Sequence, residues 1–269
     1  MSDQTLAQIL ANRVAGIDNQ HAIVMIVGSG GTGKSYWGLD LAQGVAEEIV
    51  KLRGGQPKDY FDIDKTLAII NRKEIKRIMT NPGKLAIIDL DDIGVGWNAR
   101  KYKDDFNIFL NDIIQTFRPN NNLVIMTLQS SFLIDRVPRS LAHYLVEMEE
   151  AIFSKGITIA KVFKIKIKHR DGVLHYEYLT DGRKKLLRFV GHKPPQDICD
   201  RYEIKRAEQL KIMMTDREDE ENAKGKGKEE TKKSLILRMI GMGMKKEDVI
   251  KASDCTNRYY SDVIKSIKA

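Results

Sequence analysis

Residues 21–35 read HAIVMIVGSGGTGKS, and this stretch decides the fold. A short apolar run leads into the pattern G-x-x-x-x-G-K-[ST] at Gly28–Ser35, and apolar residues recur at helical spacing over 36–53. Glycines let the backbone wrap around a phosphate with its N–H groups pointing inward, and a helix that begins near Lys34 adds a partial positive charge. The stretch therefore predicts a strand, a phosphate-binding loop and a helix.

The chemistry expected of this loop is nucleotide binding, with ATP and Mg²⁺ as the ligands. Lys34 should reach the β- and γ-phosphates, and the hydroxyl of Ser35 should be a ligand of Mg²⁺. The residues predicted to contact the nucleotide are those of the loop and the one after it: Gly28, Ser29, Gly30, Gly31, Thr32, Gly33, Lys34, Ser35 and Tyr36.

A second apolar run, 84–90, leads into three aspartates, Asp89, Asp91 and Asp92. A phosphate loop of this kind needs an acidic group on a neighbouring strand to hold Mg²⁺ and to orient the attacking water. We favour Asp91 as the Mg²⁺ ligand and Asp92 as the residue that polarises the water. Asp89 is the competing Mg²⁺ ligand, because it shares a strand face with Asp91. At least one of the three aspartates should have only a structural role.

A third buried strand is predicted at 123–128, with the polar residues Thr127 and Gln129 at its end. Each of these either contacts the γ-phosphate or water, or is an ordinary strand terminus. Three arginines flank the strand on loops: Arg118, Arg136 and Arg139. Each is either a surface residue or an arginine finger that reaches the nucleotide of a neighbouring subunit.

The rest of the chain is read from its periodicity. Short apolar strands alternate with helices up to about residue 143, which predicts an α/β fold with a parallel sheet covered on both faces. Alternating runs with Asp-Gly turns over 144–190 predict an antiparallel β extension. A helix follows over about 196–213, and the charged, glycine-containing stretch 214–233 predicts a flexible linker. Helical spacing returns at 234–269.

We therefore expect three parts. A P-loop NTPase domain spans 1–206, with its β extension at about 144–190. A helix end and charged flexible linker span 207–233, and a small all-α unit spans 234–269. In that unit three short helices with a turn at 253–255 are typical of a helix-turn-helix. A small three-helix interaction domain is the alternative.

Composition excludes several classes of protein. Of the 269 residues, 42% are hydrophobic, which is enough for a core and excludes a wholly disordered chain. No apolar run approaches the roughly 18–20 residues that cross a bilayer. Two cysteines are too few for a disulfide framework or a structural zinc site. The N-terminus lacks the pattern of a signal peptide, so an intracellular location is expected, in the host cytoplasm if the protein is viral.

The net charge of +8 is unevenly placed. Eleven basic and three acidic residues fall within 155–193, an excess as large as that of the whole chain. There, KVFKIKIK at 161–168 places Lys164, Lys166 and Lys168 on one strand face, which predicts either contact with DNA phosphates or a solvated sheet face. In the C-terminal unit the predicted DNA contacts are Asn257, Arg258, Tyr259 and Ser261, with Val249, Ala252, Tyr260, Val263 and Ile267 turned inward.

The motifs resemble those of additional-strand P-loop ATPases of the FtsK–HerA and zonular-occludens-toxin-like lineage, closest to archaeal plasmid and virus ATP-binding proteins. The resemblance covers roughly 20–206, and one departure is Asp91-Asp92 where such motors usually have Asp-Glu. The stretches that carry it are GSGGTGKS at 28–35, DDIGVGWNAR at 91–100, FLNDIIQTFRPNNNLVIMT at 109–127, SFLIDRVPRSLAHY at 131–144 and KPPQDICDRYEIKR at 193–206.

The resemblance implies a DNA-linked ATPase that forms a homo-oligomeric ring, such as a hexamer. The expected function is an ATP-hydrolysing motor for packaging, transfer or replication of a plasmid or viral genome, without a membrane partner. The first alternative is an ATP-switched DNA-binding regulator or partition factor. The second is a small-molecule kinase, which would need an acceptor pocket and a lid.

Overall fold

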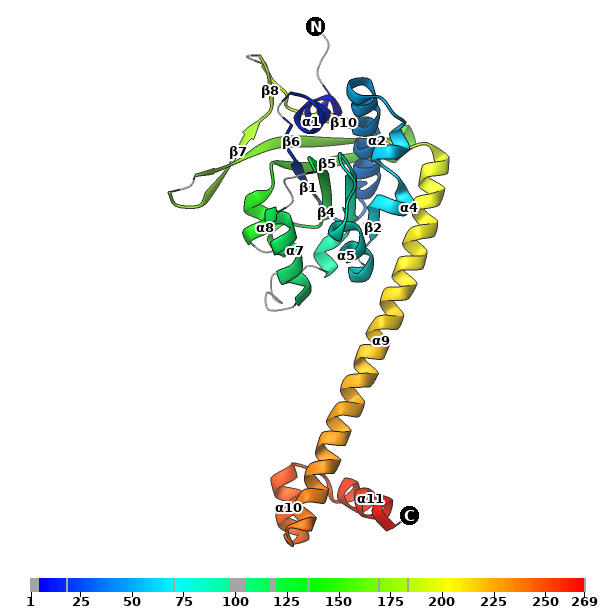
Figure 1. Ribbon diagram of the computed structural model, residues 1–269, viewed down its shortest axis with the longest axis vertical. Coiled ribbons are helices and arrows are strands. Elements are labelled where there is room, and N and C mark those ends of the chain that lie inside the picture. The colour runs from blue at the N-terminus through cyan, green and yellow to red at the C-terminus, as the bar shows by residue number, and fades with distance from the viewer. Residues whose placement is uncertain are drawn as a thin grey trace. The chain divides into compact units, whose positions relative to one another are not determined.

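The computed structural model describes residues 5–17, 19–69, 71–96, 105–116, 120–134, 136–168, 170–182 and 184–268, with the backbone alone at 95–96, 116, 216–231 and 267–268. The chain divides into two compact units, Met1–Lys211 and Ile212–Ala269 (Figure 1). The division between them falls inside the predicted connecting segment 207–233. Each unit is described by itself.

The first unit is built on one large sheet with the strand order β10-β6-β5-β1-β4-β3-β2, and β7 pairs with β6 outside that order. A separate small sheet pairs β8 with β9. The strands are β1 (Ala22–Val27), β2 (Leu67–Ile69), β3 (Ile87–Asp91), β4 (Leu123–Leu128), β5 (Tyr144–Ile152), β6 (Ile157–Lys168), β7 (Val173–Tyr178), β8 (Thr180–Asp181), β9 (Lys184–Lys185) and β10 (Phe189–His192).

Five strands form the parallel core, in the order β5-β1-β4-β3-β2. β1 and β4 pair in register from Ala22↔Leu123 to Val27↔Leu128, and β4 also pairs with β3. β4 thus lies between β1 and β3. Because the strands are parallel, the carboxyl ends of β1, β3 and β4 meet at one edge. The predicted α/β fold is confirmed.

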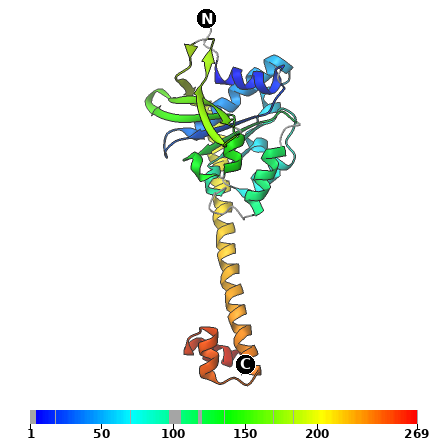
Figure 2. The ribbon, with the colours of Figure 1, turned by 90° about the vertical axis from the view of Figure 1, so that its left-hand side faces the viewer.

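Helices cover both faces of this sheet (Figures 1 and 2). On one face lie α1 (Leu6–Ala15) and α2 (Lys34–Arg53), which pack against each other. On the other face α5 (Arg72–Thr80) and α7 (Asp105–Thr116) enclose the main apolar core, beside α8 (Arg136–Leu141). The shorter helices are α3 (Pro57–Tyr60), α4 (Ile63–Thr66), α6 (Ile93–Gly96) and the 3-10 turns η2 (Ser131–Leu133) and η3 (Phe153–Lys155).

The segment predicted as an antiparallel extension begins differently from its prediction. β5 pairs parallel with β1 and antiparallel with β6, so it is the last strand of the parallel core. From β6 onward the prediction is confirmed, since β6 pairs antiparallel with β7 and β10, and β8 with β9. The sequence of this segment does not reveal that β5 also pairs with β1, because parallel strands pair with partners far away in sequence.

The predicted end of the helix near 213, followed by a linker without regular structure, is wrong. Helix α9 runs without interruption over Gln196–Gly241. Low apolar content argues against packing in a core, but not against helix formation, and Glu, Lys and Arg all favour a helix. The division into three functional parts stays a prediction.

The second unit contains the end of α9, α10 (Lys246–Ser253) and α11 (Asn257–Lys268). Ile236, Val249 and Val263, one from each helix, form its buried core. Val249 and Val263 face inward as predicted and Tyr260 packs against them, whereas Ala252 is exposed and its neighbour Ser253 is buried. The predicted inward position in α10 is therefore displaced by one residue, from Ser253 to Ala252. Ile267 lies outside the described side chains.

No helix in the described part of the chain is long and apolar enough to cross a membrane. Both cysteines are free thiols, Cys199 buried in the first unit and Cys255 half-buried in the second.

Candidate functional site

The phosphate-binding loop connects β1 to α2 at the carboxyl edge of the sheet. Gly31 and Gly33 have φ of 78° and 79°, in the left-handed region that favours glycine. Gly33 is also the N-cap of α2, and no described side chain caps that helix end. The first N–H groups of a 20-residue helix therefore face the loop, an arrangement suited to a phosphate.

One side of the loop is packed tightly against the sheet and the other is open. A Cβ at Gly33 would lie 2.7 Å from Cγ2 of Thr158 on β6. A Cβ at Gly28 would lie 2.9 Å from Cβ of Met148 on β5. At Gly30, by contrast, a Cβ would meet no described atom within 4 Å. The loop thus needs glycine at its base, where the strands approach, and leaves its tip accessible.

Lys34 lies at the centre of the loop. Its Nζ donates hydrogen bonds to the carbonyl oxygens of Gly28 at 2.8 Å and Ser29 at 2.7 Å, and the residue is only 7% exposed. Burial lowers the pKa of Lys34, while Asp92 and Asp91 act in the opposite direction. The ammonium group therefore lies close to both the loop backbone and the acidic strand end.

The acidic strand end is a hydrogen-bonded network that spans three elements. Asp91 ends β3 and is buried. Its Oδ1 accepts a hydrogen bond from Thr127 Oγ1 on β4 at 2.6 Å, and its Oδ2 accepts one from the Tyr202 hydroxyl on α9 at 2.6 Å. The N–H of Asp92 donates to the same Thr127 Oγ1 at 2.8 Å. The network fixes the Asp91 carboxylate and the backbone of Asp92 together.

The other two aspartates occupy different environments. Asp92 has a φ of 50°, in the left-handed region, and is half-buried. Burial first, and then the charge of Asp91, raise its pKa, against Arg206 and Lys34. Asp89 is 1% exposed, its Oδ1 has no hydrogen-bond partner among the described residues, and burial raises its pKa well above the usual range. The Oδ1 of Asp89 thus lacks the kind of hydrogen bond that both oxygens of Asp91 accept.

Two residues on α9 reach this site, and sequence reasoning missed both. Tyr202 is 1% exposed, and its hydroxyl interacts with Ser35 as well as Asp91. Arg206 interacts electrostatically with Tyr202 and with both Asp91 and Asp92. The stretch 193–206 does contribute to the resemblance, but nothing in its spacing shows that a helix far away in sequence returns to β3.

Tyr36, predicted to contact the nucleotide, also faces α9. Its hydroxyl donates to Glu203 Oε1 at 3.1 Å, and its ring meets that of Tyr202 edge to face at 5.9 Å. Burial, followed by Glu203, raises the pKa of Tyr36 to about 12. Thr32 Oγ1 donates to the Ser29 carbonyl at 2.8 Å, which closes the loop on itself.

The structure does not bring the remaining predicted catalytic residues into this network. Gln129 is exposed just past β4. Arg139 on α8 lies over the ring of Phe132, 5.0 Å from its centroid. Arg136 is exposed, with its Nη2 close to Gly172. Arg118 lies outside the described residues. Of the predicted residues that the structure describes, only Thr127 joins the loop and the acidic end within one chain.

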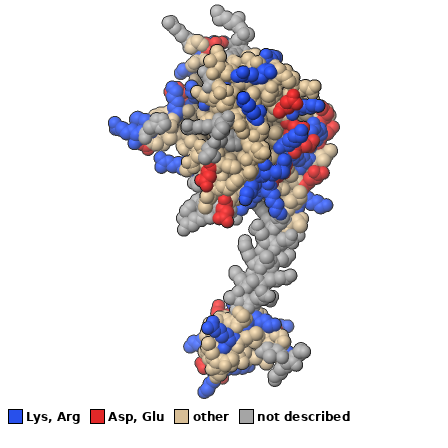
Figure 3. All heavy atoms as spheres, in the orientation of Figure 1, with Lys and Arg blue, Asp and Glu red and all other residues tan. Residues whose placement is uncertain are grey.

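The predicted lysine row lies on β6 as expected. Lys164, Lys166 and Lys168 are exposed, while Ile165 on the opposite strand face is buried. Lys166 pairs with Glu177 Oε2 of β7 at 2.6 Å. Figure 3 shows Lys and Arg atoms gathered at the end of the β6–β7 hairpin. Surface ion pairs of this kind are weak, so the lysines remain accessible to other anions.

In the second unit the predicted DNA contacts divide. Asn257 and Arg258 are exposed at the start of α11, whereas Tyr259 is half-buried and packs against the core of that unit. Ser261 is half-buried and its hydroxyl donates to the Asn257 carbonyl at 2.9 Å. Tyr259 faces inward because it lies one helical turn before Val263. The role of Tyr259 and Ser261 as DNA contacts stays a prediction.

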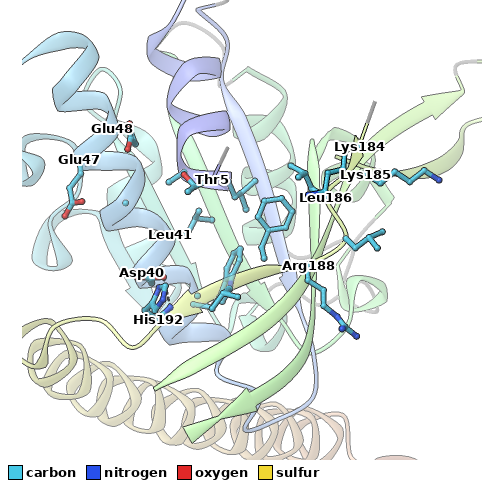
Figure 4. Close-up of a pocket in the computed structure, with 18 residues that line it drawn as sticks. Thr5, Asp40, Leu41, Glu47, Glu48, Lys184, Lys185, Leu186, Arg188 and His192 are labelled. Carbon is cyan, nitrogen blue, oxygen red and sulfur yellow. Dashed lines mark hydrogen bonds between the residues drawn. The ribbon is translucent and has the colours of Figure 1, made fainter. Parts of the chain in front are cut away.

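A pocket of about 560 Å³ adjoins α2, between α1 and the segment 184–192 (Figure 4). Figure 4 shows Glu47 and Glu48 on its α2 side and Lys184 on the opposite side. At one end the His192 N–H donates to Asp40 Oδ2 at 2.9 Å, and burial raises the pKa of Asp40. β10, which lines this pocket, and β3, which ends in the acidic residues, lie on opposite sides of β1 in the strand order.

Neither a scan against protein-family models nor a search of curated proteins finds a match for this chain. Among solved structures, it is similar to the N-terminal domain of zonular occludens toxin from Neisseria meningitidis, with 14% identity and a TM-score of 0.36 over 60% of this chain and 96% of that one.

Two further solved structures are similar. One is the genome packaging NTPase of Sulfolobus turreted icosahedral virus 2 in complex with AMPPCP, with 10% identity and a TM-score of 0.35 over 60% of this chain and 98% of that one. The other is C. elegans PCH-2, with 17% identity and a TM-score of 0.34 over 55% of this chain and 42% of that one. At these scores the likenesses carry no argument, so the site is judged on its own residues.

Those residues fit a nucleotide with Mg²⁺. The loop offers left-handed glycines, the uncapped start of a helix and a buried lysine. The Ser35 hydroxyl and the Asp91 carboxylate both interact with one phenol group, so two oxygens suited to Mg²⁺ lie close together. No cluster of three or more His, Cys, Asp or Glu that could hold a metal occurs among the described residues.

Proposed function

We propose that this protein is an ATP-binding, Mg²⁺-dependent ATPase that acts on DNA. The observation that carries the ATPase proposal is the meeting of three parts at one sheet edge. The loop after β1 holds Lys34, β3 ends in Asp91, and Thr127 of β4 binds both Asp91 and the backbone of Asp92. This is the set of groups that phosphoryl transfer to water requires.

Each residue has a defined part in this mechanism. The N–H groups of the loop and of the first turn of α2 bind the phosphates. Lys34 exchanges its bonds to the loop carbonyls for phosphate oxygens and neutralises the charge that develops in transfer. Ser35 and Asp91 would hold Mg²⁺, which supplies further neutralisation of the phosphates. Asp92 positions the attacking water.

A pocket beside α2 is large enough for a nucleoside, and none of the residues of the phosphate-binding loop is among those that line it. The pocket of about 560 Å³ is lined by both α2 and β10, and its volume lies within the range of ligand sites in proteins.

DNA is the proposed polymer because exposed lysines line one face of β6 within the basic segment 155–193. Lys164, Lys166 and Lys168 present a row of ammonium groups on one strand face. The second unit adds Asn257 and Arg258 at the exposed start of α11. Packaging, transfer and replication of a genome, and assembly into a ring such as a hexamer, are the finer parts of this proposal.

The direct test measures ATP hydrolysis with and without double- and single-stranded DNA. We expect Mg²⁺-dependent hydrolysis that DNA stimulates, and a loss of about 10²–10³-fold in Lys34→Ala. Lys51→Ala, an exposed lysine on the same helix with 65% of its side chain accessible, is the matched control and should retain activity. Hydrolysis that survives Lys34→Ala would reject the proposed mechanism.

A second test addresses the DNA surface. Changing Lys164, Lys166 and Lys168 to Glu should weaken DNA binding and lower the slope of log affinity against log salt by about one for each DNA phosphate that is no longer neutralised. The control carries the same charge change at Lys51, Lys58 and Lys84, exposed lysines outside the hairpin. Equal binding by both triple variants would remove the hairpin from the proposal.

One observation favours the alternative of an ATP-switched DNA-binding protein. The residue after Asp91 is an aspartate, one methylene shorter than glutamate, and its backbone is fixed to Thr127. A shorter carboxylate reaches less far toward a water and favours slow turnover. DNA affinity that depends on ATP, without DNA-stimulated hydrolysis, would support the switch over the motor.

A further inference from the structure

Helix α9 begins with residues that reach the candidate nucleotide site from a segment more than 100 positions beyond β3. We infer that Tyr202 and Arg206 are positioning residues of this site. Binding of Mg²⁺ with ATP displaces the Tyr202 hydroxyl from Asp91 and thereby loosens the start of α9. The inference rests on the proposed function, because it concerns the same nucleotide.

The first step is the position of the Tyr202 hydroxyl. It donates a hydrogen bond to Asp91 Oδ2 at 2.6 Å and also interacts with the Ser35 hydroxyl. These are the two protein groups that would hold Mg²⁺. Burial, then Asp91, raise the pKa of Tyr202 far above its usual range, so the phenol stays protonated as a donor. One hydroxyl group thus bridges the two predicted metal ligands.

The second step is competition. A divalent cation held by Ser35 and by Asp91 Oδ2 would compete with the phenol O–H for that carboxylate oxygen, and its charge would repel the hydrogen-bond donor directed at it. The Thr127 bond to Asp91 Oδ1 is on the other carboxylate oxygen and does not compete. Binding of the metal therefore displaces the Tyr202 hydroxyl while Asp91 stays anchored to β4.

The third step is the charge beside the acids. Arg206 lies one helical turn after Tyr202 and is half-buried. The phenol of Tyr202 first, and then Asp91, Glu203 and Asp92, raise the pKa of Arg206 against the effect of burial. Its positive charge acts on both aspartates of the acidic end, so we expect it to contribute to binding of the triphosphate.

The fourth step is the way α9 is held. Arg201 Nη2 pairs with Asp64 Oδ2 at 2.7 Å, Lys205 Nζ donates to the Ile63 carbonyl at 2.6 Å, and Gln209 Oε1 accepts from the Ile69 N–H at 2.6 Å. These contacts go to α4 and β2, not to the loop. Tyr202 donates directly to a predicted metal ligand, whereas the Glu203 bond goes to Tyr36 beside the loop, so breaking the Tyr202 bond should loosen the helix locally.

The experiment uses the full chain and a non-hydrolysable ATP analogue. Hydrogen exchange of amides in 196–211 should rise in the wild type when Mg²⁺ is added to the analogue-bound protein. In Tyr202→Phe the faster exchange should be present before Mg²⁺ is added. The Mg²⁺ concentration for half-maximal analogue binding should fall about fivefold in this variant, since one competing hydrogen bond is removed.

Tyr60→Phe is the matched control, because it also removes a phenol hydroxyl, one that donates to the Gly54 carbonyl at 2.8 Å outside the site. It should behave as the wild type in both measurements. A Mg²⁺ requirement in Tyr202→Phe that is unchanged or higher would overturn the inference for Tyr202, as would α9 exchange that ignores Mg²⁺ in the wild type.

A second variant keeps the inference testable if Tyr202→Phe folds poorly. Arg206→Gln should lower the affinity for the analogue without Mg²⁺ about tenfold, and equal affinity would overturn the role of Arg206. Failure of the proposed function is distinguishable from these outcomes. If the wild type binds no analogue, or Lys34→Ala binds it equally well, the proposed function fails; if only the α9 responses are missing, the inference alone fails.

Discussion

The phosphate-binding loop and the acidic strand end lie side by side at one sheet edge, but they are built in opposite ways. The loop is eight consecutive residues whose function depends on backbone conformation, with glycines at φ of 78° and 79° and one buried lysine. The acidic end is a network of side chains from β3, β4 and α9, in which Asp91 accepts hydrogen bonds from Thr127 and Tyr202.

This difference determines how each region should respond to substitution. A backbone-built loop tolerates side-chain change at its open tip and fails where a Cβ has no room. A side-chain network fails when a hydrogen-bonding group is removed, and conservative replacements restore it. Four predictions test or sharpen this contrast.

The largest effect is expected at the acidic end. Asp91→Asn should reduce hydrolysis about 10²–10³-fold and remove the Mg²⁺ dependence of nucleotide binding, because a charged metal ligand is removed. Asp92→Asn should reduce hydrolysis while Mg²⁺-dependent binding persists. Titration of Mg²⁺ against a fluorescent nucleotide, alongside steady-state hydrolysis, separates the two. If Asp92→Asn loses the Mg²⁺ dependence and Asp91→Asn keeps it, the assigned roles are reversed.

The next effect tests the backbone of the loop. Gly33→Ala should destabilise the loop by about 1–3 kcal/mol and weaken nucleotide binding, since φ is 79° and the new Cβ would lie 2.7 Å from Thr158 Cγ2. Gly30→Ala is the matched control, because its Cβ would meet no described atom within 4 Å. Melting temperature and nucleotide affinity measure both. Similar losses in the two variants would contradict the contrast between base and tip.

A smaller effect is expected from the hydroxyl that joins the acidic pair. Thr127→Val keeps the shape but removes the group that binds Asp91 Oδ1 and the Asp92 N–H, which should cost about 1–3 kcal/mol of unfolding free energy. Thr127→Ser retains the hydroxyl and should restore most of the stability and the hydrolysis rate. Urea unfolding and hydrolysis assays test this. An active, fully stable Thr127→Val would show that the network does not position Asp92.

The smallest effect lies outside both regions, at Asp40 on α2. Burial raises the pKa of Asp40 above its usual 3.8, so the folded state binds this proton more tightly than the unfolded chain. The stability that this group contributes is therefore fully present below about pH 4 and is lost as pH rises through its folded pKa. Asp40→Asn should make the unfolding free energy less dependent on pH than in the wild type as the pH rises above the usual carboxyl pKa of 3.8.

For this last prediction, the exposed Asp181→Asn serves as the control and should leave the pH dependence of the wild type unchanged. Urea unfolding at several pH values measures it. A pH profile that is the same in Asp40→Asn and the wild type would contradict the role of burial at this carboxyl group.

The parts of the molecule that could be predicted from sequence are those set by local pattern. The strand at 123–128, the loop with its helix, and the hairpins marked by Asp-Gly turns are all encoded by neighbouring residues. The alternation of 161–168 also placed Ile165 inward and the three lysines outward. Hydrophobic period and turn residues act over a few positions, and this is why they can be read from one sequence.

The parts that could not be predicted depend on distant contacts. β5 pairs with β1 across more than 100 positions, and α9 returns Tyr202 to Asp91 across 111. Among the aspartates, alternation put Asp89 and Asp91 on one face, and both are 1% exposed. Only tertiary hydrogen bonds distinguish them, because Asp91 accepts from Thr127 and Tyr202 whereas Asp89 Oδ1 has no partner among the described residues. The charged stretch after 213 was predicted as a linker from its polarity. It is helical instead, because its Glu, Lys and Arg residues have high helix propensity.

The two thiols offer a practical consequence. Cys199 is 2% exposed, its Sγ donates to the Pro194 carbonyl at 3.4 Å, and burial raises its pKa, so it should react slowly with maleimides. Cys255 is half-buried in the other unit. A fluorophore should therefore attach preferentially to the C-terminal unit of the natural chain, which would let its response to nucleotide be followed by spectroscopy without engineered cysteines.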